Sequence, residues 1–135
     1  MQPWIMLQTG MVTGWEDKMN IREELGKRML FFDGGLGSLL QARGLKPGEL
    51  PETWNLSKPE ELLAIHKEYL EAGADIILAN TFGANRFKYD HLQEIVEAAV
   101  KNAKKAAEEC GRNAYVALDL GPTGKLLKPM GTLDF

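Results

Sequence analysis

The sequence has very few of the residues that define several classes of protein. Its 135 residues include one cysteine, Cys110, and two histidines, His66 and His91. A single cysteine excludes an internal disulfide and is typical of a reducing, cytoplasmic compartment. These three residues are also far apart and do not match the spacing of zinc ligands. We therefore predict that this chain holds no metal ion by itself.

Long apolar runs and a strong charge imbalance are also missing. No run approaches the roughly 18 residues that a membrane-spanning helix needs. The net charge of -3 gives no reason to expect nucleic acid or an anionic membrane as a partner. With 44% hydrophobic and 26% charged residues, the composition is that of one globular domain with a core. We interpret residues 1–18 as a leader that is disordered or artefactual, and residues 19–135 as the folded domain.

The stretch around which the chain is organised is an apolar run that ends in an acid. Leu30-Phe31-Phe32 has the length of a short strand, and Asp33 follows it directly. Three glycines in four positions come next, at Gly34, Gly35 and Gly37. Glycine permits unusual backbone angles and lets a ligand approach the main chain closely. The pattern predicts a strand that exposes a carboxylate beside a tight turn.

Strands and helices alternate along the rest of the chain. Apolar runs at 74–79 and 114–120 predict two further buried strands. Helical periodicity predicts helices over 38–43, 57–72 and 90–110, each followed by a glycine. We expect Ser57 and Asp90 to cap the second and third of these helices. This alternation predicts an α/β fold with a parallel sheet.

Polar residues follow each predicted strand. They are Asp33, then Asn80 and Thr81, then Asp119. In parallel α/β folds the carboxyl ends of the strands meet at one edge, where sites form from the following loops. We therefore expect a small-molecule site there. The long connection at 45–56 either covers its mouth or is anchored on the core by Trp54.

Two nucleotide-binding motifs and two reactive side chains do not lead to a function. The glycines after Asp33 lack the third glycine of a dinucleotide fingerprint, and Gly124-Lys125 is followed by Leu126 where a phosphate loop needs a hydroxyl. His66 lies on an apolar helical stripe and is expected to be a hydrogen-bonded core or boundary residue. Cys110 is expected to be a small core residue.

Four motifs in register resemble a known family. The sequence motifs are FFDGGLGS from Phe31, PETWN from Pro51, NTFGANRF from Asn80 and GPTGK from Gly121. Together they resemble the start of the homocysteine-binding domain of cobalamin-dependent methionine synthases, from about residue 28 to residue 135. The resemblance implies the N-terminal portion of a TIM (β/α)8 barrel, with about three parallel strands, and methyl transfer to homocysteine.

The resemblance also implies roles for particular residues. Asp33 with Gly34 and Gly35 would hold the amino group and backbone end of homocysteine, a charge-assisted contact. Asn80, Thr81 and Phe82 would line the pocket, and Asp119 would be a wall of it. In the family, zinc held by three cysteines makes the substrate thiolate, which takes a methyl group from cobalamin. We assign no catalytic residue here, and expect neither zinc nor cobalamin to bind this chain alone.

The length of the chain leaves alternatives open. Eight strands need roughly 250 residues, so we expect a fragment that is inactive alone and needs the remaining barrel and the cobalamin and folate domains as partners. A fragment of a betaine- or S-methylmethionine-dependent homocysteine methyltransferase is the nearest alternative. A non-catalytic half-barrel completed by a partner chain is the other.

Overall fold

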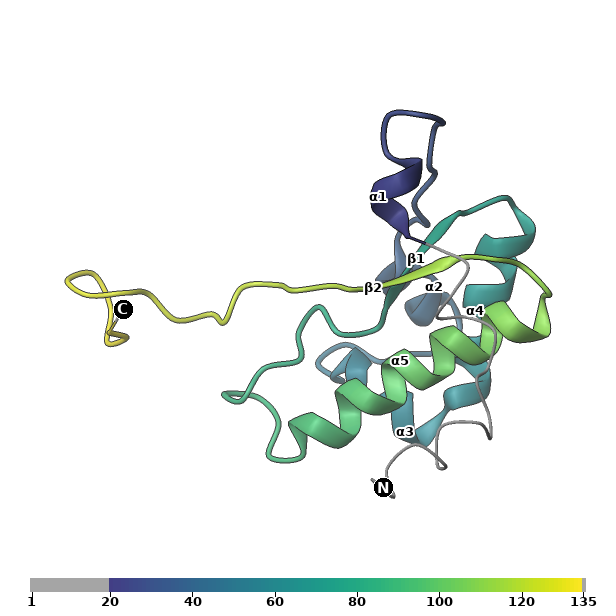
Figure 1. Cartoon of the computed structure of the whole chain (residues 1–135). Helices are drawn as coiled ribbons and strands as arrows, with labels where there is room; N and C mark the ends of the chain where they lie inside the picture. The colour runs from purple at the N-terminus through teal and green to yellow at the C-terminus, as the bar shows by residue number, and fades with distance from the viewer. Residues whose placement is uncertain (1–19, 135) are drawn as a thin grey trace, which may run out of the picture.

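The computed structural model describes residues 20–134 of the chain. The prediction for residues 1–18 lies outside this range. Two parallel strands lie beside a group of helices, and the segment after the second strand runs away from them (Figure 1). The elements in chain order are α1 (Ile21–Glu24), α2 (Leu36–Ala42), the 3-10 turn η1 (Pro51–Thr53), α3 (Trp54–Ser57), α4 (Pro59–Glu71), β1 (Ile76–Ala79), α5 (Leu92–Glu109) and β2 (Tyr115–Leu118).

Two of the three predicted strands form. β1 and β2 pair in parallel, from Ile76 opposite Tyr115 to Ala79 opposite Leu118. The prediction of a strand before Asp33 is wrong, because these residues make only one isolated parallel bridge, between Phe32 and Ile76. Their backbone still runs along β1, since Asp33 N donates to Ile76 O at 2.9 Å. Phe31 and Phe32 remain 56% and 61% exposed, so side-chain burial does not stabilise pairing here.

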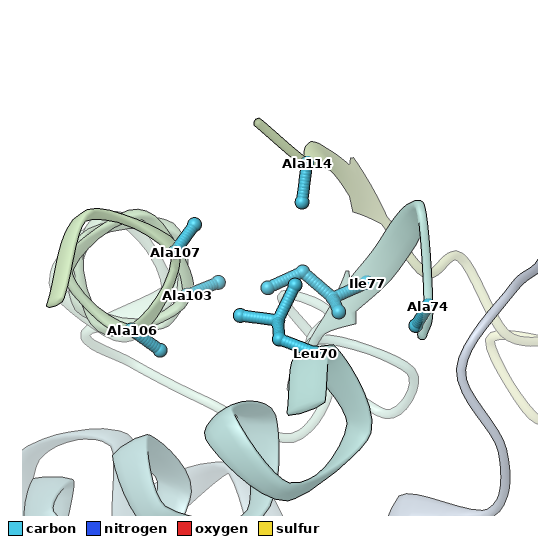
Figure 2. Packing of buried hydrophobic residues seen from close by; sticks show 7 residues of the cluster. All are labelled: Leu70, Ala74, Ile77, Ala103, Ala106, Ala107 and Ala114. Atoms are coloured by element: carbon cyan, nitrogen blue, oxygen red, sulfur yellow. The ribbon is translucent and has the colours of Figure 1, made fainter. Parts of the chain in front are cut away.

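The first hydrophobic cluster closes the amino end of the sheet. Ala74 and Ala114 lie just before the two strands, and Leu70 and Ile77 fill the space toward α5 (Figure 2). Three alanines of α5 complete the cluster, because their small side chains let the helix lie close to β1. They are Ala103, Ala106 and Ala107. The predicted apolar stripes of α4 and α5 are therefore confirmed, and Cys110 packs against this cluster.

The second cluster holds the connection before α4. Trp54 is fully buried with Leu40, Leu45, Leu62 and Ile65. Its indole Nε1 donates to Glu49 Oε1 at 2.7 Å, which satisfies the polar end of the ring. Trp54 anchors the connection as expected, but from inside the core and not on its surface. Pro51 and Glu52 of the same connection line the cavity described below.

Both predicted helix caps are wrong. Ser57 lies in the last turn of α3, and its hydroxyl donates to Thr53 O at 3.1 Å instead of capping α4. The connection forms a helical turn, α3, that begins at the buried Trp54 and ends at Ser57. α5 is preceded by His91, one residue after Asp90, and has no side-chain cap. The helix ends are confirmed, since Gly73 and Gly111 adopt φ of 109° and 62° after α4 and α5.

The prediction that His66 is a core residue is confirmed, but the prediction that it is hydrogen-bonded is wrong for the described residues. It is 1% exposed, and neither ring nitrogen has a partner among the described residues. Burial lowers the pKa of His66 to about 4, so the ring is neutral at physiological pH. Within residues 20–134, no helix has both the length and the apolar character needed to cross a bilayer.

Candidate functional site

The carboxyl ends of the strands surround a cavity of about 250 Å³. Six of the seven residues predicted for the site line it. Asp33, the seventh, lines an open groove that shares Gly34 with the cavity. The cavity is bounded by four stretches of chain: the glycine turn, η1, the end of β1 and the end of β2. Its lining residues are Gly34, Gly35, Leu36, Gly37, Pro51, Glu52, Leu78, Ala79, Asn80, Thr81, Phe82 and Asp119.

One carboxylate oxygen of Asp33 is hydrogen-bonded within the fold, and the other has no partner among the described residues. Oδ2 accepts a hydrogen bond from Leu78 N, in β1, at 2.9 Å. Oδ1 is buried and accepts no hydrogen bond from the described residues. A buried carboxylate oxygen without a donor costs free energy, and a charged donor from a ligand would recover it. Among residues 20–134, the other buried side-chain polar atoms without a partner are the two ring nitrogens of His66.

The electrostatic surroundings of Asp33 reinforce this conclusion. Burial raises the pKa of Asp33, and the like charge of Asp119 raises it further, while the bond from Leu78 N opposes both. Two carboxylates that lie close enough to repel each other attract a cation. The arrangement fits a positively charged group, such as an ammonium, better than a neutral one.

The glycine turn permits a close approach between the chain and α4. A Cβ on Gly34 would lie 2.9 Å from the Tyr69 hydroxyl oxygen, so only glycine fits without movement. Tyr69 Oη donates to Gly35 O at 3.3 Å, and Ser38 Oγ donates to the same carbonyl at 3.1 Å. The turn is therefore fixed by side chains from two helices, which sets the position of Asp33 relative to the cavity.

Asn80 and Thr81 build the wall of the cavity. Asn80 Nδ2 donates to Pro51 O at 2.9 Å and to Asn55 Oδ1 at 3.0 Å. Thr81 Oγ1 donates to Asp119 O at 2.9 Å and accepts from Asp119 N at 3.0 Å, which joins the ends of β1 and β2. The neighbouring Phe82 is 57% exposed. These amide and hydroxyl groups hold the strand ends together.

Sequence reasoning missed one polar residue of the site, Glu52. It is 4% exposed and lines the cavity from η1. Its Oε1 accepts from Gly83 N, and its Oε2 accepts from the Tyr89 hydroxyl, both at 2.5 Å. The only signal was its place inside the Pro51–Asn55 motif, because its burial depends on Tyr89, which is far along the chain.

A larger hollow of about 570 Å³ lies on the outer side of α5. Within the described residues its lining comes from this one helix, with Val96 and Val100 between lysines and glutamates. It contains no buried polar group without a partner. The smaller cavity at the strand ends is therefore the better candidate.

The residues that the structure describes do not fit a zinc ion. Between residues 20 and 134, no three histidine, cysteine or acidic side chains lie close enough together to hold a metal. Cys110 follows α5 and packs against the first cluster, at the amino end of the sheet and away from the cavity. The described part of the site therefore offers polar groups around a cavity, but no metal centre.

Comparison with known proteins identifies the family. The family model for homocysteine S-methyltransferases matches residues 30–135. The chain belongs to this family. A methionine synthase of Mycobacterium tuberculosis is 31% identical over 122 residues, which cover 79% of this chain and 10% of that protein. The predicted resemblance is confirmed at the level of the family.

Solved structures of a homocysteine methyltransferase share the fold. The metallated form of MmuM from Escherichia coli matches with a TM-score of 0.64 and 24% identity, over 76% of this chain and 41% of that one. The oxidized form matches with a TM-score of 0.65 and 23% identity, over 78% and 42%. The chain thus spans less than half of these structures and a tenth of the methionine synthase.

Proposed function

We propose that the cavity at the strand ends binds the amino-acid end of homocysteine, and that the chain contributes this half of the site to methyl transfer that forms methionine. The observation that carries the proposal is the free Oδ1 of Asp33. The ammonium of an amino acid would donate to it, beside Gly34 and Gly35. Asn80, Thr81, Phe82 and Asp119 would enclose the same end of the ligand.

Electrostatics support an ammonium ligand at Asp33. An isolated carboxylate loses hydration on burial, and the nearby Asp119 adds repulsion. An ammonium between the two would reverse both effects. Binding would therefore lower the pKa of Asp33 toward or below its ordinary value of 3.8.

The sulfur end of the substrate requires residues other than those described. A thiol with a pKa near 8.5 is mostly protonated at neutral pH and needs activation before it can accept a methyl group. The described residues offer no metal centre for this step. We propose that further strands complete a barrel beside β2 and beside Phe31–Phe32. The exposed aromatic side chains of these two residues line an open groove of about 460 Å³, which Asp33 also lines.

We propose transfer of the methionine synthase kind, with cobalamin as the methyl carrier on another domain. The 31% identity to a methionine synthase supports this choice over the donors betaine and S-methylmethionine. Assay of a complete protein that contains this chain, with each donor in turn, would decide between them. Methionine formed only from betaine or S-methylmethionine would contradict the cobalamin proposal.

A titration followed by 1H–15N NMR tests the binding proposal with the chain itself. L-Homocysteine and L-methionine should both shift the amide signals of Gly34, Gly35 and Thr81, with a Kd on the order of 1 mM. 4-Mercaptobutanoate keeps the thiol and carboxylate but lacks the ammonium, so it should bind at least about tenfold more weakly. Equal shifts with 4-mercaptobutanoate, or none at these amides with homocysteine, would overturn the proposal.

A further inference from the structure

We propose that Glu52 is a positioning residue of this site, and that it acts by fixing the backbone at Gly83, next to Phe82, which lines the cavity. This inference rests on the proposed function for its effect on homocysteine binding. Its structural part concerns only bonds within the chain.

The first argument is the bonding of the Glu52 carboxylate. It is buried, and its two oxygens accept from two different donors, Gly83 N and Tyr89 Oη, both at 2.5 Å. A carboxylate accepts on both oxygens, and this matches two donors without leaving either unsatisfied. Burial and then the bond to Glu52 raise the pKa of Tyr89, so its hydroxyl stays protonated and continues to donate.

The second argument is that Phe82, the residue next to Gly83, is bonded to a further segment. Gly121 N donates to Phe82 O at 2.9 Å, beyond the end of β2. A Cβ on Gly83 would lie 2.7 Å from Glu52 Oε1, and one on Gly121 would lie 2.4 Å from Phe82 O. The segment therefore has close neighbours both at Gly83 and at Phe82. Removing Glu52 would leave Gly83 N without its acceptor, while the bonds from Gly121 N to Phe82 O and from Asn85 Nδ2 to Gly83 O would remain.

The third argument is location. Glu52 lines the cavity, and its neighbour Pro51 accepts the hydrogen bond from Asn80 Nδ2. The 3-10 turn η1 thus sets the positions of Asn80 and Gly83, on either side of Thr81. Binding of a small ligand is sensitive to wall displacements of about 1 Å. Loss of the Glu52 contacts should therefore weaken binding without any direct contact between Glu52 and the ligand.

Three variants test the proposal. Glu52→Ala removes both acceptors, and Tyr89→Phe removes one donor. Glu52→Gln keeps the shape and one acceptor for Gly83 N, while the Tyr89 hydroxyl can turn to accept from the new amide. Arg43→Met is the control, because Arg43 pairs with Glu61 and Glu68 on α4 and does not line the cavity.

The first readout needs no ligand. In Glu52→Ala, the Gly83 amide should exchange with solvent at least about tenfold faster than in the wild type, with the Leu70 and Ile77 amides unchanged. Tyr89→Phe should give a smaller increase, and Glu52→Gln should exchange within about threefold of the wild type. If the Gly83 amide exchanged at the same rate in Glu52→Ala as in the wild type, the proposal would be overturned, whether or not homocysteine binds.

The second readout is the affinity of L-homocysteine, measured where urea unfolding shows each variant to be fully folded. Glu52→Ala should bind about tenfold more weakly, Glu52→Gln within about threefold, and Arg43→Met like the wild type. Equal affinity of folded Glu52→Ala and wild type would overturn the positioning role and leave the proposed function intact. Failure of the wild type to bind would instead contradict the proposed function, and Gly83 exchange would still decide the contacts of Glu52.

Discussion

The two ends of the small sheet carry the same kind of bond with opposite consequences. At the amino end, Asp75 Oδ2 accepts from Phe31 N at 3.0 Å, and at the carboxyl end, Asp33 Oδ2 accepts from Leu78 N at 2.9 Å. The second oxygen of Asp75 pairs with Arg28 at 2.9 Å. The second oxygen of Asp33 has no partner among the described residues. Both oxygens of Asp75 are bonded within the fold, whereas only one oxygen of Asp33 is.

The pKa values of Asp75 and Asp33 are shifted in opposite directions, in agreement with their bonding. The bonds from Phe31 N and Arg28 lower the pKa of Asp75, whereas burial and Asp119 raise the pKa of Asp33. Hydrophobic packing follows the same division, since the first cluster closes the amino end and the cavity opens at the carboxyl end. We infer that the amino end stabilises the fold and that the carboxyl end serves binding at some cost in stability.

The largest expected effect concerns stability alone. Leu70 is fully buried in the first cluster, so Leu70→Ala should lower the free energy of unfolding by about 3 kcal/mol. Urea unfolding measures this change. The affinity of the protein that remains folded should not change, because Leu70 does not line the cavity. If fully folded Leu70→Ala bound L-homocysteine tenfold more weakly than the wild type, the separation of stability and binding between the two ends of the sheet would be wrong.

The next effect concerns binding alone. Asp33→Asn should weaken L-homocysteine binding by about 2 kcal/mol, because the ammonium loses its charged partner. The free energy of unfolding should stay the same or rise, since a neutral amide avoids the cost of burying the charge. NMR titration and urea unfolding of one sample measure both quantities. A clear loss of stability with unchanged affinity would show that Asp33 belongs to the fold and not to the site.

The matched substitution at the amino end of the sheet, Asp75→Asn, should lower stability and leave binding unchanged. Asp75→Asn keeps an acceptor for Phe31 N but loses the charge that pairs with Arg28, a side chain that is 45% exposed. We expect a smaller loss in the free energy of unfolding than in Leu70→Ala, because solvent screens the exposed pair. Homocysteine affinity should be unchanged. Comparable loss of affinity in Asp75→Asn and Asp33→Asn would remove the contrast between the ends.

The pH dependence of stability gives the smallest and sharpest test. Because the pKa of Asp33 is raised, its ionisation destabilises the fold, and the advantage of Asp33→Asn should vanish as the pH falls through a value above 3.8. Because the pKa of Asp75 is lowered, its contribution is present above 3.8 and is lost as the pH falls through a value below 3.8. Unfolding curves between about pH 7 and pH 3 should show these transitions in that order. The reverse order would contradict the account.

Local patterns predicted the helices and the convergence of polar residues at the strand ends. α4 and α5 follow from apolar spacing, and Asp33, Asn80, Thr81 and Asp119 follow from the geometry of parallel strands. The features that sequence reasoning missed all depend on distant partners. The run before Asp33 forms only a bridge because its aromatic side chains are not covered.

Glu52 and the helix caps show the same limit. Nothing near Glu52 in the sequence indicates burial, because Tyr89 and Gly83 lie more than 30 residues away and charged loop residues are usually exposed. Ser57 has the pattern of a cap, but burial of Trp54 extends a helical turn through it. The expected hydrogen bond of His66 is absent within the described residues, and periodicity alone could not reveal that.

The most direct test of the account is the pKa of Asp33, measured by 13C NMR of its carboxyl carbon with and without ligand. In the free chain the pKa should lie above 3.8, and saturating L-homocysteine should lower it, whereas 4-mercaptobutanoate should not. A free pKa at or below the ordinary value, or one that homocysteine does not lower, would contradict the claim that this carboxylate is kept available for an ammonium.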